Sequence, residues 1–296
     1  MVERTLKDFL VEKPRWCAGC GNYNIIAALK KLSVDRRLAP HEVINVSGIG
    51  CSGRMPNYIN TFGIHSIHGR PITVGFGLAL ARKEAKIFIH SGDGDALSIG
   101  GNHLLHGINR NFHCVFLLYD NQTYALTKNQ ASPTTPAGRK TLSHPSGVRM
   151  EPLNVIRMVL GIGASFVAAT ADWLPDHLSH TIEAAYEHTG FSFVHVLQRC
   201  VHYNPRGFNI DSPDWYSFII HPDGIPPDKK YQNTAEQVTH DPGDLIKAFE
   251  LAIGVKTHLG LFYRNPLKPC QDDMLREQTE QTAQKPRSGI LDSYRF

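Results

Sequence analysis

The chain of 296 residues is 42% hydrophobic and 20% charged, which is typical of a globular protein rather than a disordered or fibrous one. Its formal net charge of +4 is too small to predict nucleic-acid binding, although it is compatible with docking a small acidic protein. The sequence contains no run of about 18 apolar residues, so no membrane span is predicted. The charged first 16 residues lack the apolar core of a signal peptide. We therefore expect a cytoplasmic protein.

The first two thirds of the chain alternates helical patterns with short apolar, β-rich runs. In chain order, helical patterns fall at residues 23–32, 72–82, 98–109, 152–160 and 173–188. Strand patterns fall at residues 43–46, 86–90, 114–119, 165–168 and 193–197. This alternation predicts an α/β fold, in which a parallel sheet carries helices on both faces. In such sheets, ligands bind at the carboxyl ends of the strands.

The composition changes after about residue 201. Residues 202–244 are rich in Pro, Asp, Asn and Gly, with one apolar patch at 218–220, and residues 245–262 predict a further helix and strand. We therefore divide the chain into a domain at residues 1–203 and a C-terminal extension at residues 204–296, which packs on the core or on a partner subunit. The alternative for the last 25 or so residues is a partly disordered tail.

A glycine-rich turn follows the strand predicted at residues 86–90. It reads Ser-Gly-Asp-Gly-Asp, with Asp93 between Gly92 and Gly94, and a helix pattern begins soon after it. Such a turn lets backbone N–H groups approach an anion, and the Asp93 carboxylate suits a hard cation. The next predicted strand is followed by Asp120 and Asn121, and 26 residues (95 to 120) lie between Gly94 and Asn121. Gly-Asp-Gly alone is common turn chemistry, but an Asn at a second strand end makes a binding site the better interpretation.

Four of the six cysteines fall at junctions between predicted elements. Cys17 and Cys20 precede the first helix, Cys51 follows the first strand, and Cys200 follows the strand at 193–197. Disulfides are not expected in a reducing cytoplasm, so these thiols predict a four-iron cluster or a zinc site. The remaining two are expected to be a core residue, Cys114, and an ordinary free thiol in the extension, Cys270.

The Gly-Asp-Gly turn and the distant Asn resemble the thiamine-diphosphate signature. This resemblance implies that Mg²⁺ is bound by the side chains of Asp93 and Asn121 and by the backbone carbonyl of Thr123. Many members of that family have Asn where this chain has Asp120, which is not usually a ligand.

Five motifs together resemble the β subunit of 2-oxoacid:ferredoxin oxidoreductases, over about residues 14–205. They are Trp-Cys-Ala-Gly-Cys-Gly (16–21), Gly-Ile-Gly-Cys-Ser (48–52), His-Gly-Arg (68–70), Gly-Asp-Gly-Asp with Ile-Gly-x-x-His (92–103) and the stretch from Tyr to Thr at 124–135. The resemblance implies a thiamine-diphosphate-binding fold with a 4Fe–4S cluster on Cys17, Cys20, Cys51 and Cys200. It also implies cofactor contacts from Ile49, Gly50, Ser52, His68, Gly92, Asp93, Gly94, Asp95, Asn121, Thr123, Tyr124, Ala125 and Leu126.

The resemblance further implies the reaction and its partners. Such enzymes catalyse the reversible, coenzyme A-dependent oxidative decarboxylation of a 2-oxoacid and pass electrons through the cluster to ferredoxin. We expect a partner α subunit to carry the pyrimidine-binding domain and its essential carboxylate, in an (αβ)₂ heterotetramer. His68, in the loop that faces the cofactor in this family, is a candidate for proton handling or for polarising the substrate.

Two cations bear on the choice of substrate. Arg54 lies three residues after Cys51, and Lys128 lies in the motif at 124–135. A second carboxylate on the substrate would favour cations there, so we favour 2-oxoglutarate, converted to succinyl-CoA and CO₂, over pyruvate or a broad range of 2-oxoacids. The alternative for Arg54 and Lys128 is a solvated loop charge or a phosphate contact.

Two other functional classes explain only part of the pattern. A thiamine-dependent decarboxylase or carboligase without redox chemistry accounts for Asp93 and Asn121 but not for four cysteines at element junctions. A non-catalytic iron–sulfur electron-transfer subunit accounts for the cysteines but not for the diphosphate motif.

Overall fold

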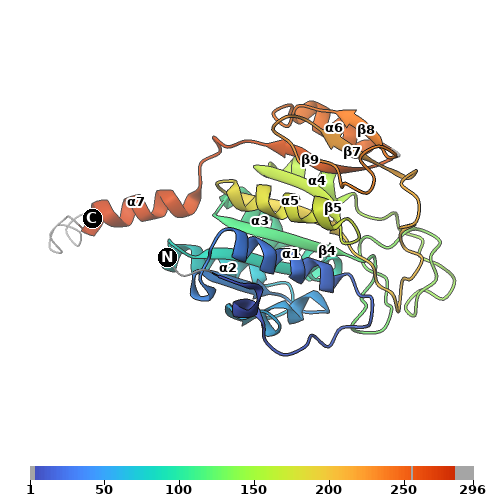
Figure 1. Ribbon diagram of the computed structural model, residues 1–296, viewed down its shortest axis with the longest axis horizontal. Helices are drawn as coiled ribbons and strands as arrows, with labels where there is room; N and C mark the ends of the chain where they lie inside the picture. The colour runs from blue at the N-terminus through green and yellow to red at the C-terminus, as the bar shows by residue number, and fades with distance from the viewer. Residues whose placement is uncertain (1–3, 255, 284–296) are drawn as a thin grey trace, which may run out of the picture.

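The computed structural model describes residues 4–254 and 256–283, which form one mixed β-sheet flanked by helices (Figure 1). Within the described residues the sheet has nine strands, in the order β2-β1-β3-β4-β6-β5-β9-β7-β8. The strands are β1 (Val43–Ser47), β2 (Phe62–His65), β3 (Lys86–Gly92), β4 (Cys114–Asp120), β5 (Phe166–Ala171), β6 (Phe191–Leu197), β7 (Tyr216–Ile220), β8 (Glu236–Thr239) and β9 (Thr257–Arg264).

Seven α-helices accompany this sheet in the described part of the chain. They are α1 (Asn22–Asp35), α2 (Pro71–Ala81), α3 (Gly101–Arg110), α4 (Val155–Ile162), α5 (Pro175–Glu187), α6 (Leu245–Ile253) and α7 (Gln271–Ala283). Short helical turns occur at Leu6–Phe9, Pro40–Glu42, Ser52–Asn57 and, as one π-helical turn, at Asp95–Ile99. None of these helices is long and apolar enough to cross a membrane.

Each face of the sheet carries its own hydrophobic core. Helices α2, α3, α4 and α6 bury apolar side chains against one face, for example Ile72, Leu104 and Val159. Helices α1 and α5 pack on the other face, where Ile25 and Ile182 belong to a second core. Alternate residues of the central strands point into the two cores, so strands buried on both faces read as continuous apolar runs. The predicted α/β fold with helices on both faces is therefore confirmed.

All ten elements predicted before residue 200 are present, with bounds that differ by a few residues. The edge strand β2 was missed, because it is only four residues long, contains a glycine and is exposed along its whole length. Strands β1, β3, β4, β6 and β5 pair in parallel. Their registers align Gly92 with Tyr119 and Asp120 with Leu197, so the loops after these strands open at the same edge.

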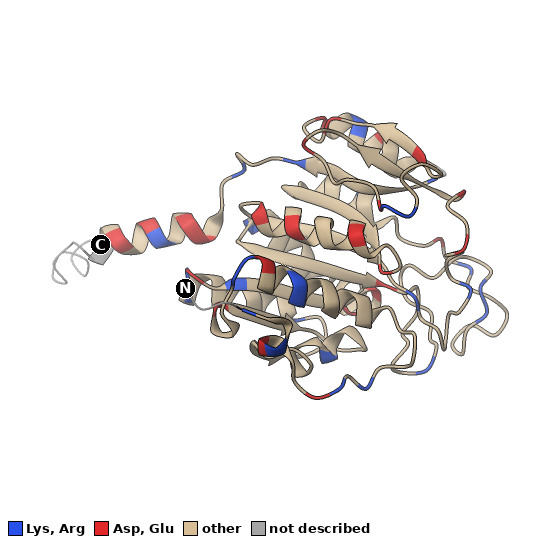
Figure 2. Ribbon diagram, viewed as in Figure 1, with Lys and Arg blue, Asp and Glu red and all other residues tan. Residues whose placement is uncertain are grey.

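The segment after residue 203 continues the same sheet. Strand β9 pairs antiparallel with β5 and parallel with β7, and β8 pairs with β7 at the edge. The division into a domain and an extension at residue 203 stays a prediction. Helix α7 extends away from the body of the molecule at the end of the described chain (Figure 1), and Figure 2 shows acidic positions and a basic one along it. Residues 284–296, which belong to the predicted tail, lie outside the described residues.

Candidate functional site

A cavity of about 160 Å³ opens at the carboxyl edge of the sheet, between the loops that follow β1, β3 and β4. Its walls bring together all of the residues predicted to contact a diphosphate cofactor. They are Ile49, Gly50, Ser52, His68, Gly92, Asp93, Gly94, Asp95, Asn121, Thr123, Tyr124, Ala125 and Leu126, joined by Cys51, Tyr119, Thr127 and Gln198. The parallel pairing of the strands accounts for this gathering, since each segment leaves the sheet at the same edge.

Asp93 is buried beside a second carboxylate. Its side chain follows β3, and Asp120 ends the neighbouring strand β4. The Thr134 hydroxyl lies between them, 2.8 Å from Asp93 Oδ2 and 2.7 Å from Asp120 Oδ1. Burial and the charge of Asp120 raise the pKa of Asp93 to about 7. Two buried carboxylates this close favour a bound cation, so Asp93 suits the Mg²⁺ that the sequence predicts.

The turn after β4 presents further oxygen atoms to the cavity. Asn121 and Thr123 are both buried, and the Thr123 N–H donates to Asn121 Oδ1 at 3.1 Å. Asn121 Nδ2 donates to Gln198 Oε1 at 3.1 Å, which fixes the orientation of the amide. The turn itself depends on Gln122, whose φ of 61° places it in the left-handed region. Carboxylate, amide and carbonyl oxygens of this kind are the ligands that hard cations prefer.

A close approach of the chain explains why the turn needs Gly94. A Cβ atom at this position would lie 2.2 Å from the Tyr124 ring, so any larger residue would displace that ring. The Tyr124 hydroxyl donates to the Gly94 carbonyl oxygen at 3.1 Å. The two loops that line the cavity are therefore held together directly, and the backbone after β3 remains accessible from the cavity.

Asp95 lines the same cavity, but its carboxylate is occupied by protein donors. It accepts hydrogen bonds from the backbone N–H groups of Ile49 and Gly69 at 3.1 and 2.7 Å, and from the Ser91 hydroxyl. His68 Nδ1 contacts the same carboxylate oxygen, Oδ1. Asp95 thus holds the loops after β1 and β2 in place, and its predicted contact with the cofactor stays a prediction.

We expect Asp95→Ala to destabilise the fold by about 3 kcal/mol or more, because a buried donor that loses its acceptor costs ~1–3 kcal/mol and several donors lose theirs together. The free energy of unfolding measured in urea checks this. The matched control is Asp35→Ala, which removes an exposed ion pair with Lys31 and should cost less than about 1 kcal/mol. Equal losses for the two variants would contradict the positioning role of Asp95.

The four cysteines at element junctions line a second cavity of about 280 Å³, next to the first. Cys17 is exposed, and Cys20, Cys51 and Cys200 are half-buried. Burial, together with the charges of the neighbouring thiols, raises the pKa of Cys20 to about 12 and that of Cys51 to about 11. Thiols that hinder one another's ionisation in this way favour a cationic centre, which would stabilise all four thiolates.

Hydrogen bonds join the segments that carry these cysteines. Trp16 Nε1 donates to the Cys51 carbonyl oxygen at 2.8 Å, and the Gly21 N–H donates to the Arg199 carbonyl oxygen at 3.3 Å. Elsewhere among the described residues, one group of side chains that could bind a metal ion has ligand atoms that all lie within 4.8 Å of one another. These four cysteines do not belong to that group. Four thiols that line one cavity can hold a four-iron cluster, as the resemblance implies.

The two cavities are adjacent and share part of their lining. The shared residues are Cys51, Asn121, Ala125, Leu126 and Gln198. A centre held by the cysteines would therefore lie beside a cofactor bound at Asp93. This adjacency is the feature on which the chemistry of the site depends.

The remaining predicted residues fall in different places. Arg54 is half-buried in the cysteine cavity, where its charge acts on Cys51. His68 lines the cavity that contains Asp93, the Asp93 cavity. Lys128 is exposed in a turn, with a φ of 73°, and it lines neither of these two cavities. The structure therefore brings Arg54 and His68 to the site but does not bring Lys128 there.

Sequence reasoning missed two residues that support the site. Gln198 orients Asn121 and also donates to Asn22 Oδ1 at 2.6 Å. Arg139 donates to the Gln122 carbonyl oxygen at 2.7 Å and to the Tyr203 carbonyl oxygen at 3.0 Å. Arg139 therefore links the turn after β4 to the segment after Cys200. No local pattern identifies either residue, because their partners are distant in the chain.

Comparisons with known proteins identify the family of the chain. Residues 48–196 match the family model described as thiamine pyrophosphate enzyme, C-terminal TPP binding domain. The 2-oxoglutarate oxidoreductase subunit KorB of Mycobacterium tuberculosis is 42% identical over 204 residues, which are 69% of this chain and 55% of that protein. The β subunit of 2-oxoacid:ferredoxin oxidoreductase 1 of Aeropyrum pernix is 36% identical over 264 residues, 88% of this chain and 81% of that protein.

A solved structure extends the likeness to the whole chain. It is a 2-oxoglutarate:ferredoxin oxidoreductase from Magnetococcus marinus with 2-oxoglutarate, coenzyme A and succinyl-CoA bound. The match has a TM-score of 0.87 at 30% identity and covers 100% of this chain and 98% of that one. Fold, site and relatives agree, and the chain belongs to the family of 2-oxoacid:ferredoxin oxidoreductase β subunits.

Proposed function

We propose that this chain is the thiamine-diphosphate- and iron–sulfur-binding subunit of an enzyme that converts a 2-oxoacid, coenzyme A and oxidised ferredoxin reversibly to acyl-CoA, CO₂ and reduced ferredoxin. We favour 2-oxoglutarate as the substrate and succinyl-CoA as the product. The observation that carries this proposal is the shared lining of the cysteine cavity and the Asp93 cavity. A decarboxylase without redox chemistry has no need of four thiols at that place.

Asp93, Asn121 and the carbonyl of Thr123 would hold Mg²⁺, which would in turn bind the diphosphate. Backbone groups of the turn at Gly92 and Gly94 would approach the phosphates, and Tyr124 would fix that turn through its bond to Gly94. When bound, thiamine diphosphate supplies the electron sink for loss of CO₂ from a 2-oxoacid. Cys17, Cys20, Cys51 and Cys200 would hold a 4Fe–4S cluster close enough to accept the electrons.

The lining of the Asp93 cavity supports the need for a partner subunit. Among the described residues its carboxylates are Asp93 and Asp95, and both already have roles. The carboxylate that activates the aminopyrimidine ring must then come from elsewhere, which suits a partner α subunit in an (αβ)₂ heterotetramer. Exposed apolar side chains near His68, namely Phe62, Ile64 and Ile67, offer a surface for that partner.

The experiment that tests the proposal is an anaerobic assay of the chain alone and of its co-purified complex. The complex should consume 2-oxoacid and coenzyme A and reduce ferredoxin, with 2-oxoglutarate preferred to pyruvate and 2-oxobutyrate. The chain alone should be inactive with a low-potential dye. Robust turnover by the chain alone would exclude an active site shared with a partner, and activity without electron transfer would favour a non-redox enzyme.

Arg54 is the better candidate of the two cations for the distal carboxylate of 2-oxoglutarate. We expect Arg54→Gln to raise KM for 2-oxoglutarate about tenfold, which corresponds to ~1.4 kcal/mol, and to change KM for 2-oxobutyrate little. Lys128→Gln is the matched control, since Lys128 lies outside both cavities. Parallel changes for both substrates would remove Arg54 from substrate selection.

Binding of Mg²⁺ and thiamine diphosphate should depend on pH through Asp93. The pKa of its carboxyl is raised from 3.8 to about 7 by burial and by Asp120. Below about pH 7 the metal-free site must lose a proton before Mg²⁺ binds, so the apparent affinity should fall up to tenfold per pH unit on acidification and level off above pH 7. Calorimetric titration of the complex across this range measures the slope.

The raised pKa of Asp93 also sets the sign of its effect on stability. Between pH 3.8 and about 7 the unfolded chain ionises at this carboxyl while the metal-free folded chain keeps its proton. The contribution of Asp93 to the stability of the metal-free chain therefore falls as the pH rises through this window. Asp120→Asn removes the neighbouring charge and should move the pH dependence toward lower pH. A pH-independent affinity in both proteins would contradict this account.

A further inference from the structure

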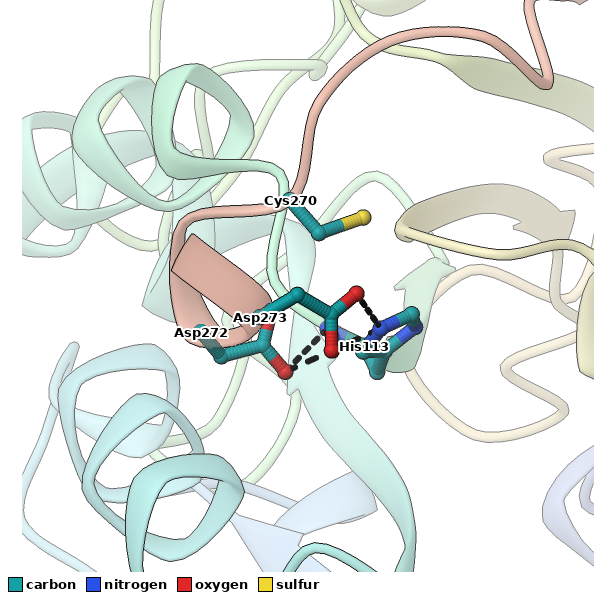
Figure 3. A group of neighbouring side chains, drawn as sticks. All are labelled: His113, Cys270, Asp272 and Asp273. Atoms are coloured by element: carbon teal, nitrogen blue, oxygen red, sulfur yellow. Dashed lines mark hydrogen bonds and ion pairs between the residues drawn. The ribbon is translucent and has the colours of Figure 1, made fainter. Parts of the chain in front are cut away.

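Four side chains that could bind a metal ion gather near the start of β4 (Figure 3). His113, Cys270, Asp272 and Asp273 each offer one ligand atom, and these atoms all lie within 4.8 Å of one another. His113 directly precedes β4, whereas the Asp93 cavity lies beyond Asp120 at the other end of the same strand. The two sites therefore lie at opposite ends of strand β4.

The local fold brings these residues together from distant parts of the chain. Helix α3 ends at Asn111 in the left-handed conformation, and the chain then turns into β4 past His113. Cys270 precedes α7, and the two aspartates lie in its first turn. Asn111 Nδ2 lies 3.6 Å from Cys270 Sγ, so the end of α3 and the start of α7 are in direct contact.

The contacts within the group are polar and incomplete. His113 Nε2 lies 2.7 Å from Asp273 Oδ2. The backbone N–H of His113 donates to Asp272 Oδ2 at 3.4 Å. Arg276 binds Asp272 Oδ2 and Asp273 Oδ1 at 2.9 and 3.0 Å. The Asp272 side chain is 0% exposed, yet its second oxygen, Oδ1, has no hydrogen-bond partner. A buried carboxylate oxygen without a partner is unfavourable unless a cation or a donor reaches it.

The charges of the group also favour a bound cation. Asp272 and Asp273 supply two negative charges, and Arg276 supplies one positive charge among them. Arg276 lies on α7 itself, so this arginine and the two carboxylates together leave one net negative charge. A divalent cation would balance the carboxylates and displace the thiol proton.

We propose that His113 Nε2, Cys270 Sγ and one oxygen each of Asp272 and Asp273 form a structural zinc site. A set with one sulfur, one imidazole nitrogen and two carboxylate oxygens suits Zn²⁺. Four protein ligands leave no open position, which is the mark of a structural rather than a catalytic site. On binding, the Cys270 thiol loses its proton to solvent and the thiolate joins the metal. Arg276 remains on the outer oxygens and orients the carboxylates.

Zinc binding would require the group to contract. Tetrahedral zinc with bonds of about 2.0–2.3 Å separates its ligand atoms by roughly 3.3–3.8 Å, and the present group spreads to 4.8 Å. Helix α7 can move to close the group, because it projects from the body and is attached mainly at its first turns (Figure 1). Arg276 Nη2 also donates to the Ala79 carbonyl oxygen at 2.8 Å, which joins α7 to the end of α2. Zinc would therefore connect the first turn of α7 to the start of β4.

The test uses the co-purified complex, prepared anaerobically with added zinc and then dialysed against a chelator. Elemental analysis should find about one zinc per chain. Zinc-edge X-ray absorption should find one sulfur at about 2.3 Å and three nitrogen or oxygen neighbours at about 2.0–2.1 Å. Trace zinc alone would overturn the proposal. So would a shell of sulfur only, because that signal places zinc in the cysteine cavity.

Variants give an independent check. Cys270→Ser and His113→Gln should each lower the zinc content at least fivefold and leave the iron content unchanged. His106→Gln is the matched control, since His106 is an exposed histidine on α3 outside the group, and it should keep its zinc. Zinc that persists in both Cys270→Ser and His113→Gln would overturn the assignment. Should one variant fail to fold, the absorption spectrum of the unmodified complex decides alone. Iron is measured in the same samples, so failure of the zinc site is distinct from failure of the proposed function.

Discussion

Asp93→Asn is expected to abolish Mg²⁺-dependent binding of thiamine diphosphate and, with it, turnover of the complex. The substitution keeps the size of the side chain but replaces a carboxylate ligand by a weaker amide. Loss of partners that only orient metal ligands already costs ~10–100-fold in affinity or activity, so removal of a direct ligand should cost more than about 100-fold. Calorimetric titration with thiamine diphosphate and Mg²⁺, followed by the ferredoxin assay, measures both effects.

Asp120→Asn is the matched control for this experiment. Asp120 is equally buried and shares the Thr134 hydroxyl with Asp93, but its other oxygen lies 2.8 Å from His195 Nε2. It is not a predicted ligand, so the control should retain cofactor binding at neutral pH. Comparable losses in both variants would mean that the carboxylate pair acts as a unit, and the assignment of Asp93 as the ligand would fail.

The sequence was sufficient to predict the central elements and the edge at which the site lies. Strands β3 and β4 read as short apolar runs, and Asp93 and Asn121 follow them directly. Because parallel pairing aligns Gly92 with Tyr119, the two motifs necessarily meet at one edge. The same reasoning applies to Cys200, since β6 lies next to β4 and its end aligns with Asp120.

The contacts that hold the site together were not predictable in the same way. Asp95 looked like part of a phosphate-binding turn, but it accepts bonds from donors in three segments, which only the folded chain brings together. Gln198 and Arg139 also act on loops far away in the chain. Sequence periodicity reports which face of an element is buried, and it carries no information about side-chain partners in other loops.

The two cations predicted to contact the substrate take different positions in the fold, and the role of Lys128 stays a prediction. Lys128 was chosen with Arg54 as a cation for the substrate because both lie in segments that carry motifs. The turn that contains Lys128 bends back so that the Asn129 N–H donates to the Tyr124 carbonyl oxygen at 3.0 Å, and the lysine is exposed. Arg54 instead lies on the short helical turn after Cys51 and lines the cysteine cavity. Spacing in sequence did not distinguish these two outcomes.

Cys20→Ser is expected to remove the iron–sulfur cluster while leaving the diphosphate site intact. Cys20 lines the cysteine cavity only, unlike Cys51, which borders both cavities. Serine oxygen is a poor replacement for a thiolate toward iron. The visible absorption of the anaerobic complex should disappear, and ferredoxin reduction should fall by at least about two orders of magnitude, because the electrons lose their only proposed route to the acceptor.

The partial reactions distinguish the loss of electron transfer from a general loss of structure. The Cys20→Ser complex should still bind thiamine diphosphate with Mg²⁺, because the Asp93, Asn121 and Tyr124 contacts do not involve Cys20. Cys114→Ala is the matched control, since Cys114 is buried in β4 and lines neither cavity, and it should keep both the cluster and ferredoxin reduction. If Cys20→Ser retained its iron and its ferredoxin activity, the four cysteines would not be the cluster ligands. The adjacency of the two cavities would then have no redox meaning, and a thiamine enzyme without electron transfer would become the better interpretation.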